Sequence, residues 1–103
     1  FAKTHWFEKS PDENLEMMHT AAVRCLVELP LAQREAIVLK IWHQHTFEEI
    51  GALLDISPNT AAGRYRYGLQ KIKSRLEEKN YERNGFTGDA IALLETAPPV
   101  GVA

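Results

Sequence analysis

A run of basic and hydrogen-bonding side chains between residues 56 and 76 has the clearest chemistry in the sequence. The run holds five cations and no carboxylate: Arg64, Arg66, Lys71, Lys73 and Arg75. Neutral donors and acceptors are interleaved with the cations: Asn59, Thr60, Tyr67 and Gln70. Cations of this kind bind phosphates, and side-chain donors and acceptors match base edges in the major groove of DNA. A helix that is polar only for solubility would more often mix Glu with Lys.

The elements that would position these side chains form a helix-turn-helix pattern from Thr46 to Leu76. Thr46 and Glu49 have the spacing of a capping box, which begins a short helix. Asp55 lies in the turn, where positive φ is often needed, and Ser57 with Pro58 begins a longer helix. The apolar positions of this longer helix fall on one face: Ala61, Tyr65, Gly68, Leu69, Ile72 and Leu76. Two ordinary helices with a solvated basic face are the alternative interpretation.

Two further helices are predicted upstream. The first begins with Ser10 as its N-cap and Glu13 as the capping-box partner, and Pro30 ends it. The second runs from about Leu31 to Trp42 and is apolar nearly all round in its middle. Such a helix is enclosed by several neighbours or exposes one face to a partner. We expect at least one of its large apolar residues to contact a partner protein: Ile37, Val38, Leu39, Ile41 and Trp42.

The 103 residues divide into three predicted parts. Residues 1–9 form a linker or loose end, and residues 10–79 form a small all-α, four-helix domain that contains the helix-turn-helix. Residues 80–103 form a tail, for which the sequence leaves two interpretations open. The tail is a disordered end, or residues 89–95 form a short segment that docks on an apolar groove through Ile91, Leu93 and Leu94. The chain begins at Phe1 rather than Met, which indicates a fragment or a processed product.

Charge and composition restrict the possible functions. The net charge is −2, so a free-standing DNA reader would need dimerisation or a partner that holds it at its site. No run is long enough to span a membrane, and no signal segment opens the chain. Cys25 is the only cysteine and lies in an apolar helical pattern, which excludes an intrachain disulfide and fits the cytoplasm.

No catalytic constellation is present in the sequence. It contains no glycine-rich phosphate loop, no carboxylate pair in an apolar setting and no nucleophile beside a base. His43 and His45 could share a metal ion, but no third Cys or His lies nearby, so a polar loop is the favoured interpretation. We therefore expect no enzyme activity, no cofactor and no metal.

The order of these residues resembles region four of bacterial RNA polymerase sigma factors, closest to the extracytoplasmic-function group. The resemblance covers residues 10–79 and rests on Leu29-Pro30, Gln33-Arg34, Ala36-Ile37, Leu39, Thr46-Phe47-Glu48-Glu49-Ile50, Ile56-Ser57 and Asn59-Thr60-Ala61. The chain departs from the family at Ala61, where Val is frequent, and at Ala62-Gly63, where a cation and a serine are frequent. It also has Gln44 where the family usually has Gly. These departures concern base preference more than fold.

The resemblance implies a domain whose last helix enters the major groove of the minus thirty-five promoter element. It also implies that the earlier helices bind the β-subunit flap of RNA polymerase and, in this group, often an anti-sigma factor. Residues matching base-facing or nearby backbone-facing positions are Asn59, Thr60, Ala62, Gly63, Arg66 and Tyr67. Residues matching phosphate-side positions are Thr46, Ser57, Arg64 and Lys71, and Arg34 matches a family arginine.

Two other functions share this predicted fold. A sigma-like interaction module would bind polymerase or an anti-sigma factor without reading DNA. A dimeric helix-turn-helix repressor would bind an inverted repeat without polymerase. The sequence also lacks region two, which in this family melts the downstream promoter element, so the chain alone is not expected to initiate transcription.

Overall fold

Five α-helices and no strand make up residues 11–78 and 90–97, the part of the chain described by the computed structural model. They are α2 (Pro11–Glu28), α3 (Leu31–Ile41), α4 (Phe47–Leu54), α5 (Pro58–Glu78) and α6 (Ala90–Thr96). The all-α class is confirmed: four helices lie between residues 10 and 79, and α6 is a fifth helix outside that range. The predicted linker at 1–9 and the Ser10 cap lie outside the described residues.

Local signals fix the ends of the two helix-turn-helix segments. The Thr46 hydroxyl accepts the Glu49 backbone N–H, and the Glu49 carboxylate accepts the Thr46 backbone N–H, so the predicted capping box begins α4. Asp55 ends α4 in the left-handed region, at φ 58° and ψ 49°. Ser57 Oγ accepts the backbone N–H of Thr60 and begins α5. The turn therefore has the backbone shape that the sequence predicts.

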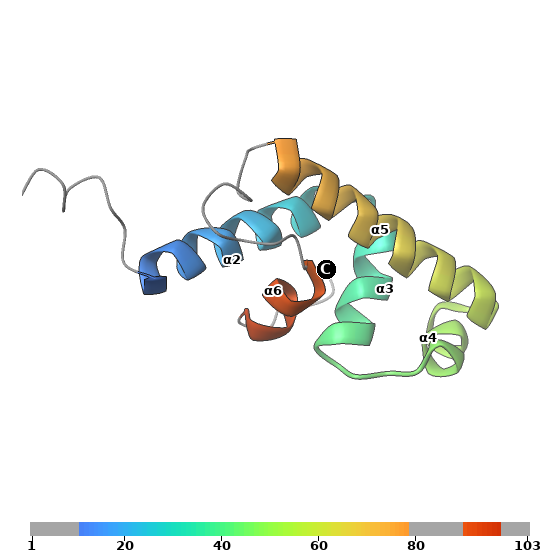
Figure 1. Cartoon of the computed structure of the whole chain (residues 1–103). Coiled ribbons are helices and arrows are strands. Elements are labelled where there is room, and N and C mark those ends of the chain that lie inside the picture. Colours follow the sequence, from blue (N-terminus) through green and yellow to red (C-terminus); the bar gives the residue numbers. More distant parts are fainter. Residues whose placement is uncertain (1–10, 79–89, 98–103) are drawn as a thin grey trace, which may run out of the picture.

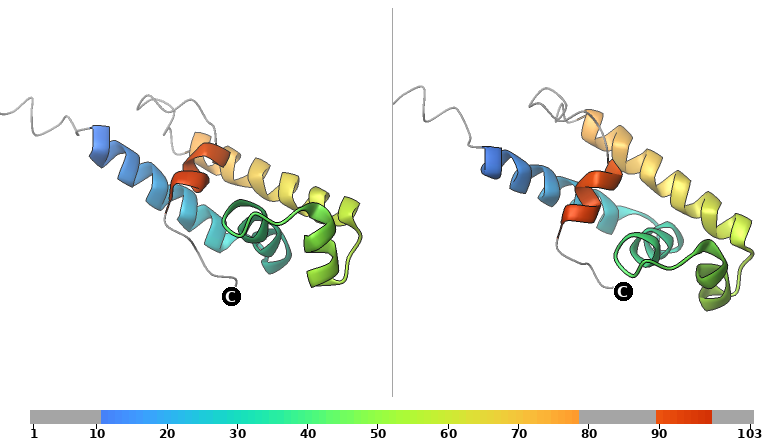
Figure 2. Two further views of the ribbon diagram at one scale, coloured as in Figure 1. Left: turned by 90° about the horizontal axis from the view of Figure 1, so that it is seen from below. Right: turned by 60° about the horizontal axis from the view of Figure 1, so that its bottom comes forward.

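Helix α5 is the longest element, and the other helices pack along it (Figure 1). Helix α4 lies beside the first turns of α5, α3 crosses its middle, and α2 approaches its last turns (Figure 2). The crossing of α3 and α5 is close at Gly68, where a Cβ atom would lie 2.6 Å from Cδ1 of Ile37. The turn is equally close at Gly51, where a Cβ would lie 2.6 Å from the carbonyl oxygen of Ile56.

One buried apolar cluster joins α2, α3, α5 and α6. Its largest fully buried side chains include Leu26 of α2, Ile37 of α3, Ile72 and Leu76 of α5, and Leu94 of α6. Cys25 is also buried in this cluster, as its place in the apolar pattern predicts. Helix α6 is thus seated on the core, against α2 and beside α3 and α5 (Figure 1).

Candidate nucleic-acid interface

Helix α5 has two faces with opposite surroundings. Its inward face is packed, and Ala61, Gly68, Ile72 and Leu76 are buried there. Its outward face begins at Asn59 and continues at helical spacing through Gly63 and Arg66 to Gln70. Asn59, Arg66, Tyr67, Gln70 and Lys71 are exposed, and Tyr67 exposes 67% of its surface. The first half of α5 therefore presents a polar and cationic surface to solvent.

The cations on this outward surface are not used by the fold. The side chains of Arg64, Arg66, Lys71 and Lys73 form no ion pair or hydrogen bond with any residue in 11–78 or 90–97. Among the other cations in the described residues, Arg34, Lys40 and Arg75 have partners within the domain. Arg75 pairs with Glu28 at 2.8 Å, and the ammonium of Lys40 lies 4.5 Å from the ring centroid of Phe47. The free cations on α5 are available to phosphates or base edges.

Gly63 lies near the centre of the outward face, with nothing within 4 Å of the position that a Cβ would take. A glycine inside a helix destabilises it by roughly 1 kcal/mol relative to Ala. Gly51 and Gly68 are explained by close contacts within the domain, whereas Gly63 has no such contact. Its small size therefore serves no packing purpose in the described part of the chain.

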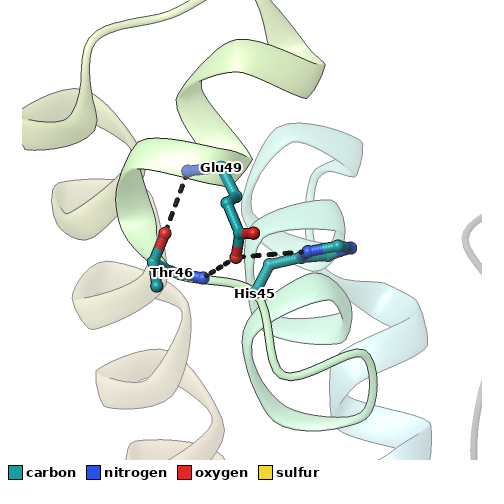
Figure 3. Close-up of polar contacts among 3 residues, drawn as sticks. All are labelled: His45, Thr46 and Glu49. Atoms are coloured by element: carbon teal, nitrogen blue, oxygen red, sulfur yellow. Dashed lines mark hydrogen bonds and ion pairs between the residues drawn. The ribbon is translucent and has the colours of Figure 1, made fainter.

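Two predicted phosphate-side residues are also helix caps. In Figure 3 the Thr46 hydroxyl faces the Glu49 amide, and the Glu49 carboxylate faces both the Thr46 amide and His45. The backbone N–H of Thr46 is the main cause that lowers the pKa of Glu49 below its ordinary value, and His45 adds to it. Ser57 Oγ accepts from Thr60 N and donates to Thr60 Oγ1. Thr46 and Ser57 are both exposed, but their side chains already have hydrogen-bond partners within the helix caps.

Arg34 lies apart from the outward face of α5. Its Nη1 donates to the carbonyl oxygen of Val27 near the end of α2, at 2.9 Å, and its Nε is buried without an acceptor in the described ranges. The guanidinium thus holds the corner between α2 and α3. Arg34 thus has a structural role, and its contact with a DNA phosphate stays a prediction.

A stack of side chains connects the three helices around the turn, and the sequence pattern gave no sign of it. Lys40 of α3 lies over the ring of Phe47 in α4, and Phe47 meets Tyr65 of α5 edge to face, with centroids 5.5 Å apart. Burial is the main cause that raises the pKa of Tyr65, and Glu95 of α6 raises it further. The stack fixes α4 against α5 and so orients the outward face.

The predicted partner residues separate into two groups. Ile37 and Val38 have no exposed surface, so they are core residues, which corrects the expectation that they contact a partner. Leu39, Ile41 and Trp42 are partly exposed. An all-round apolar helix does not reveal which of its sides its neighbours will cover, and here α5 covers the side that carries Ile37.

Comparison with known proteins identifies this arrangement. The sequence model of the family "Sigma-70, region 4" matches residues 19–72, which include α3, α4 and the outward face of α5. The chain belongs to the Sigma-70 region 4 family. Region 4 is a non-enzymatic, DNA-binding domain of sigma factors, the one that binds the minus thirty-five promoter element.

A curated relative supports the same family for this region 4 chain. This chain is similar to "RNA polymerase sigma factor CarQ" of Myxococcus xanthus, with 36% identity over 73 residues. The match covers 71% of this chain and 42% of the relative, so the chain spans less than half the length of that protein. No solved structure matches the chain significantly.

Two other kinds of site are absent from the described part of the region 4 domain. None of its helices in residues 11–78 and 90–97 has the length and apolar character to cross a membrane. Within the same ranges, no group of three or more His, Cys, Asp or Glu side chains is placed to hold a metal ion. The rings of His43 and His45 stack with their centroids 6.3 Å apart. The outward face of α5 is thus the candidate site.

Proposed function

We propose that the outward face of α5 enters the major groove of the minus thirty-five element and reads its bases. The carrying observation is that this face is polar and cationic, and that its Asn59, Arg66 and Tyr67 side chains have no partner in the described residues, while the opposite face holds the core. Arg66 and Tyr67 read base edges, and Asn59 and Thr60 lie nearest the floor of the groove at the start of the helix. Gly63 and Ala62 let the helix backbone approach the DNA.

Phosphate contacts would surround this base-reading strip. Arg64 and Lys71 lie on one flank of α5, where Lys71 is exposed and Arg64 is half-buried. Neither side chain has a partner in the described residues, so both could meet a phosphate row. Thr46 and Ser57 stand at the starts of α4 and α5, the two helix N-termini around the turn. A helix N-terminus favours an anion, so these positions suit backbone phosphates.

We also propose that the domain acts while attached to core RNA polymerase, in the cytoplasm. The net charge of −2 gives the free chain little general attraction to DNA, so a tether would supply most of its occupancy. Leu39, Ile41 and Trp42 are the partly exposed apolar residues that would contact the β flap or an anti-sigma factor.

The test of base reading compares Arg66→Ala and Tyr67→Ala with Lys71→Ala across a panel of minus thirty-five variants. Loss of a base contact should weaken binding by about 1–3 kcal/mol on the preferred sequence and much less on mismatched ones. Lys71→Ala should weaken all sequences alike and flatten the salt dependence, because a phosphate contact carries no sequence information. Equal profiles for the Arg66 and Lys71 variants would contradict this placement of α5.

The tether is tested by titrating one labelled promoter fragment at two salt concentrations. The chain alone should bind weakly and lose affinity with salt, and a complete sigma protein carrying this domain on core polymerase should bind ~10²–10⁴-fold more tightly. Nanomolar binding by the chain alone at physiological salt would instead favour a self-sufficient repressor. Binding to polymerase with no preference for promoter DNA would favour the interaction module.

A further inference from the structure

Helix α6 lies outside the residues that the family shares. The family match ends at residue 72, and α6 begins at Ala90. Even so, Leu93 and Leu94 are buried in the same cluster as Met18 and Ala22 of α2. A helix additional to the matched domain therefore covers an apolar face of that domain, mainly along α2 (Figure 1).

Two side-chain hydrogen bonds hold the last turn of α6 in place. Nε2 of His19 in α2 lies 2.7 Å from Oγ1 of Thr96. The indole N–H of Trp42, directly after α3, donates to the carbonyl oxygen of Ala97 at 3.2 Å. One end of α6 is thus anchored beside Trp42 and Ile41, two of the three partly exposed residues proposed to contact a partner protein.

The seat of α6 accepts a short amphipathic helix with a defined spacing. Ala90, Leu93, Leu94 and Ala97 are buried, at positions i, i+3, i+4 and i+7, whereas Ile91 and Glu95 are exposed. The helix has seven residues, and isolated helices shorter than ~12–15 residues are marginal in water. Helix α6 thus depends on packing against the core for its structure. Only two leucines and two alanines of this segment are buried in that contact.

We propose that α6 occupies, within the chain, a docking face for core RNA polymerase and competes with polymerase for that face. The inference rests on the proposed attachment to polymerase. It states in addition that α6 must leave its contact with the core before polymerase can bind. A partner that contacts Ile41 and Trp42 meets the anchored end of α6, because Trp42 uses its indole N–H to hold Ala97. The contact therefore lowers polymerase affinity until it is broken.

The experiment measures binding of the full chain to core RNA polymerase for the wild type and two variants. Leu93→Ala combined with Leu94→Ala removes the buried contacts of α6 and should raise polymerase affinity about tenfold. Ile91→Ala is the matched control, because it makes the same kind of change on the exposed side of the same helix, and it should leave affinity unchanged. Amide hydrogen exchange checks that α6 has opened in the double variant while α3 and α5 stay protected.

A second measurement uses the unmodified chain, so it does not depend on a variant that folds. Adding core polymerase should speed amide exchange in residues 93–97 about tenfold or more while α5 stays protected. Slower or unchanged exchange there in a formed complex would overturn the competition.

Affinity that is unchanged or lower in the double variant, with α6 shown to be open and the core folded, would overturn the inference and leave the proposed function standing. Failure of both the wild type and the double variant to bind polymerase would overturn the inference together with the attachment. Promoter recognition, measured on the same samples without polymerase, tests the DNA-reading proposal separately.

Discussion

The two faces of α5 contain one glycine each, and these glycines have opposite surroundings. A Cβ on Gly68 would lie 2.6 Å from Ile37 and 3.3 Å from Leu29, whereas a Cβ on Gly63 would meet nothing within 4 Å. The two glycines of this helix therefore need two different explanations. Gly68 allows two helices to pack closely, whereas the position that a Cβ on Gly63 would take is open space in the described part of the chain.

Cations show the same difference between regions of the domain. Arg75 on the last turns of α5 pairs with Glu28, and Arg34 donates to Val27, so both stabilise the fold. Arg64 and Arg66 on the first half of the helix have no such partners in the described residues. Cations on one helix thus differ in whether the fold uses them.

The largest expected effect follows from the inward face. Ile72→Ala should lower the free energy of unfolding by about 2–5 kcal/mol, because Ile72 is fully buried and its loss leaves a cavity. Gln70→Ala, on the outward face of the same helix, should change it by no more than about 0.5 kcal/mol. Urea denaturation of both variants measures the difference. Similar losses of unfolding free energy for the two variants would contradict the assignment of Ile72 to a packed face and Gln70 to a solvent-exposed face.

The two glycines give a sharper test of intermediate size. Gly68→Ala should destabilise the domain, because overpacking against buried Ile37 costs about 1–3 kcal/mol and outweighs the helix propensity gained. Gly63→Ala should instead raise stability by about 0.5–1 kcal/mol. If the backbone approaches DNA at Gly63, the same change should weaken promoter binding about tenfold, near 1.4 kcal/mol. A Gly63→Ala variant that binds promoter DNA as tightly as the wild type would remove this explanation.

The smallest effect concerns exposed side chains that already have partners. The lowered pKa of Glu49 means that its carboxylate stabilises α4 at neutral pH, and this contribution is lost as acid titrates the group through its folded-state pKa. The stability difference between the wild type and Glu49→Gln should therefore shrink as the pH falls. Glu48→Gln is the control, because Glu48 lies on the same turn without the Thr46 bond. A difference that grows in acid would contradict the capping assignment.

Features set by neighbours in sequence were predictable. The capping box at Thr46, the positive φ at Asp55 and the buried stripe of α5 all follow from spacings of a few residues. The positive φ of 56° at Gln44 also accounts for the glycine that the resembling family usually has there. Each of these signals depends on backbone chemistry within one or two turns.

Features set by distant residues were not predictable. The pairing of His19 with Thr96 spans 77 positions, and no periodic pattern encodes it. The burial of Ile37 and Val38 depends on which helices pack against α3. Because α3 is apolar nearly all round, its sequence does not show which side is covered. The outward residues of α5 could be proposed from the sequence because helical spacing separates them from the apolar face. The family resemblance added which of them match DNA-facing positions, and their DNA contacts remain predictions.

The absence of internal partners along the outward face has an evolutionary consequence. Asn59, Arg66, Tyr67 and Gln70 are exposed, and no side-chain hydrogen bond or ion pair joins them to residues 11–78 or 90–97. Substitutions at such positions usually change stability by only a few tenths of a kcal/mol. If these positions read promoter bases as proposed, a duplicated copy of this gene could change its promoter preference through them with little loss of stability. A randomised library at the same four positions would explore that change directly.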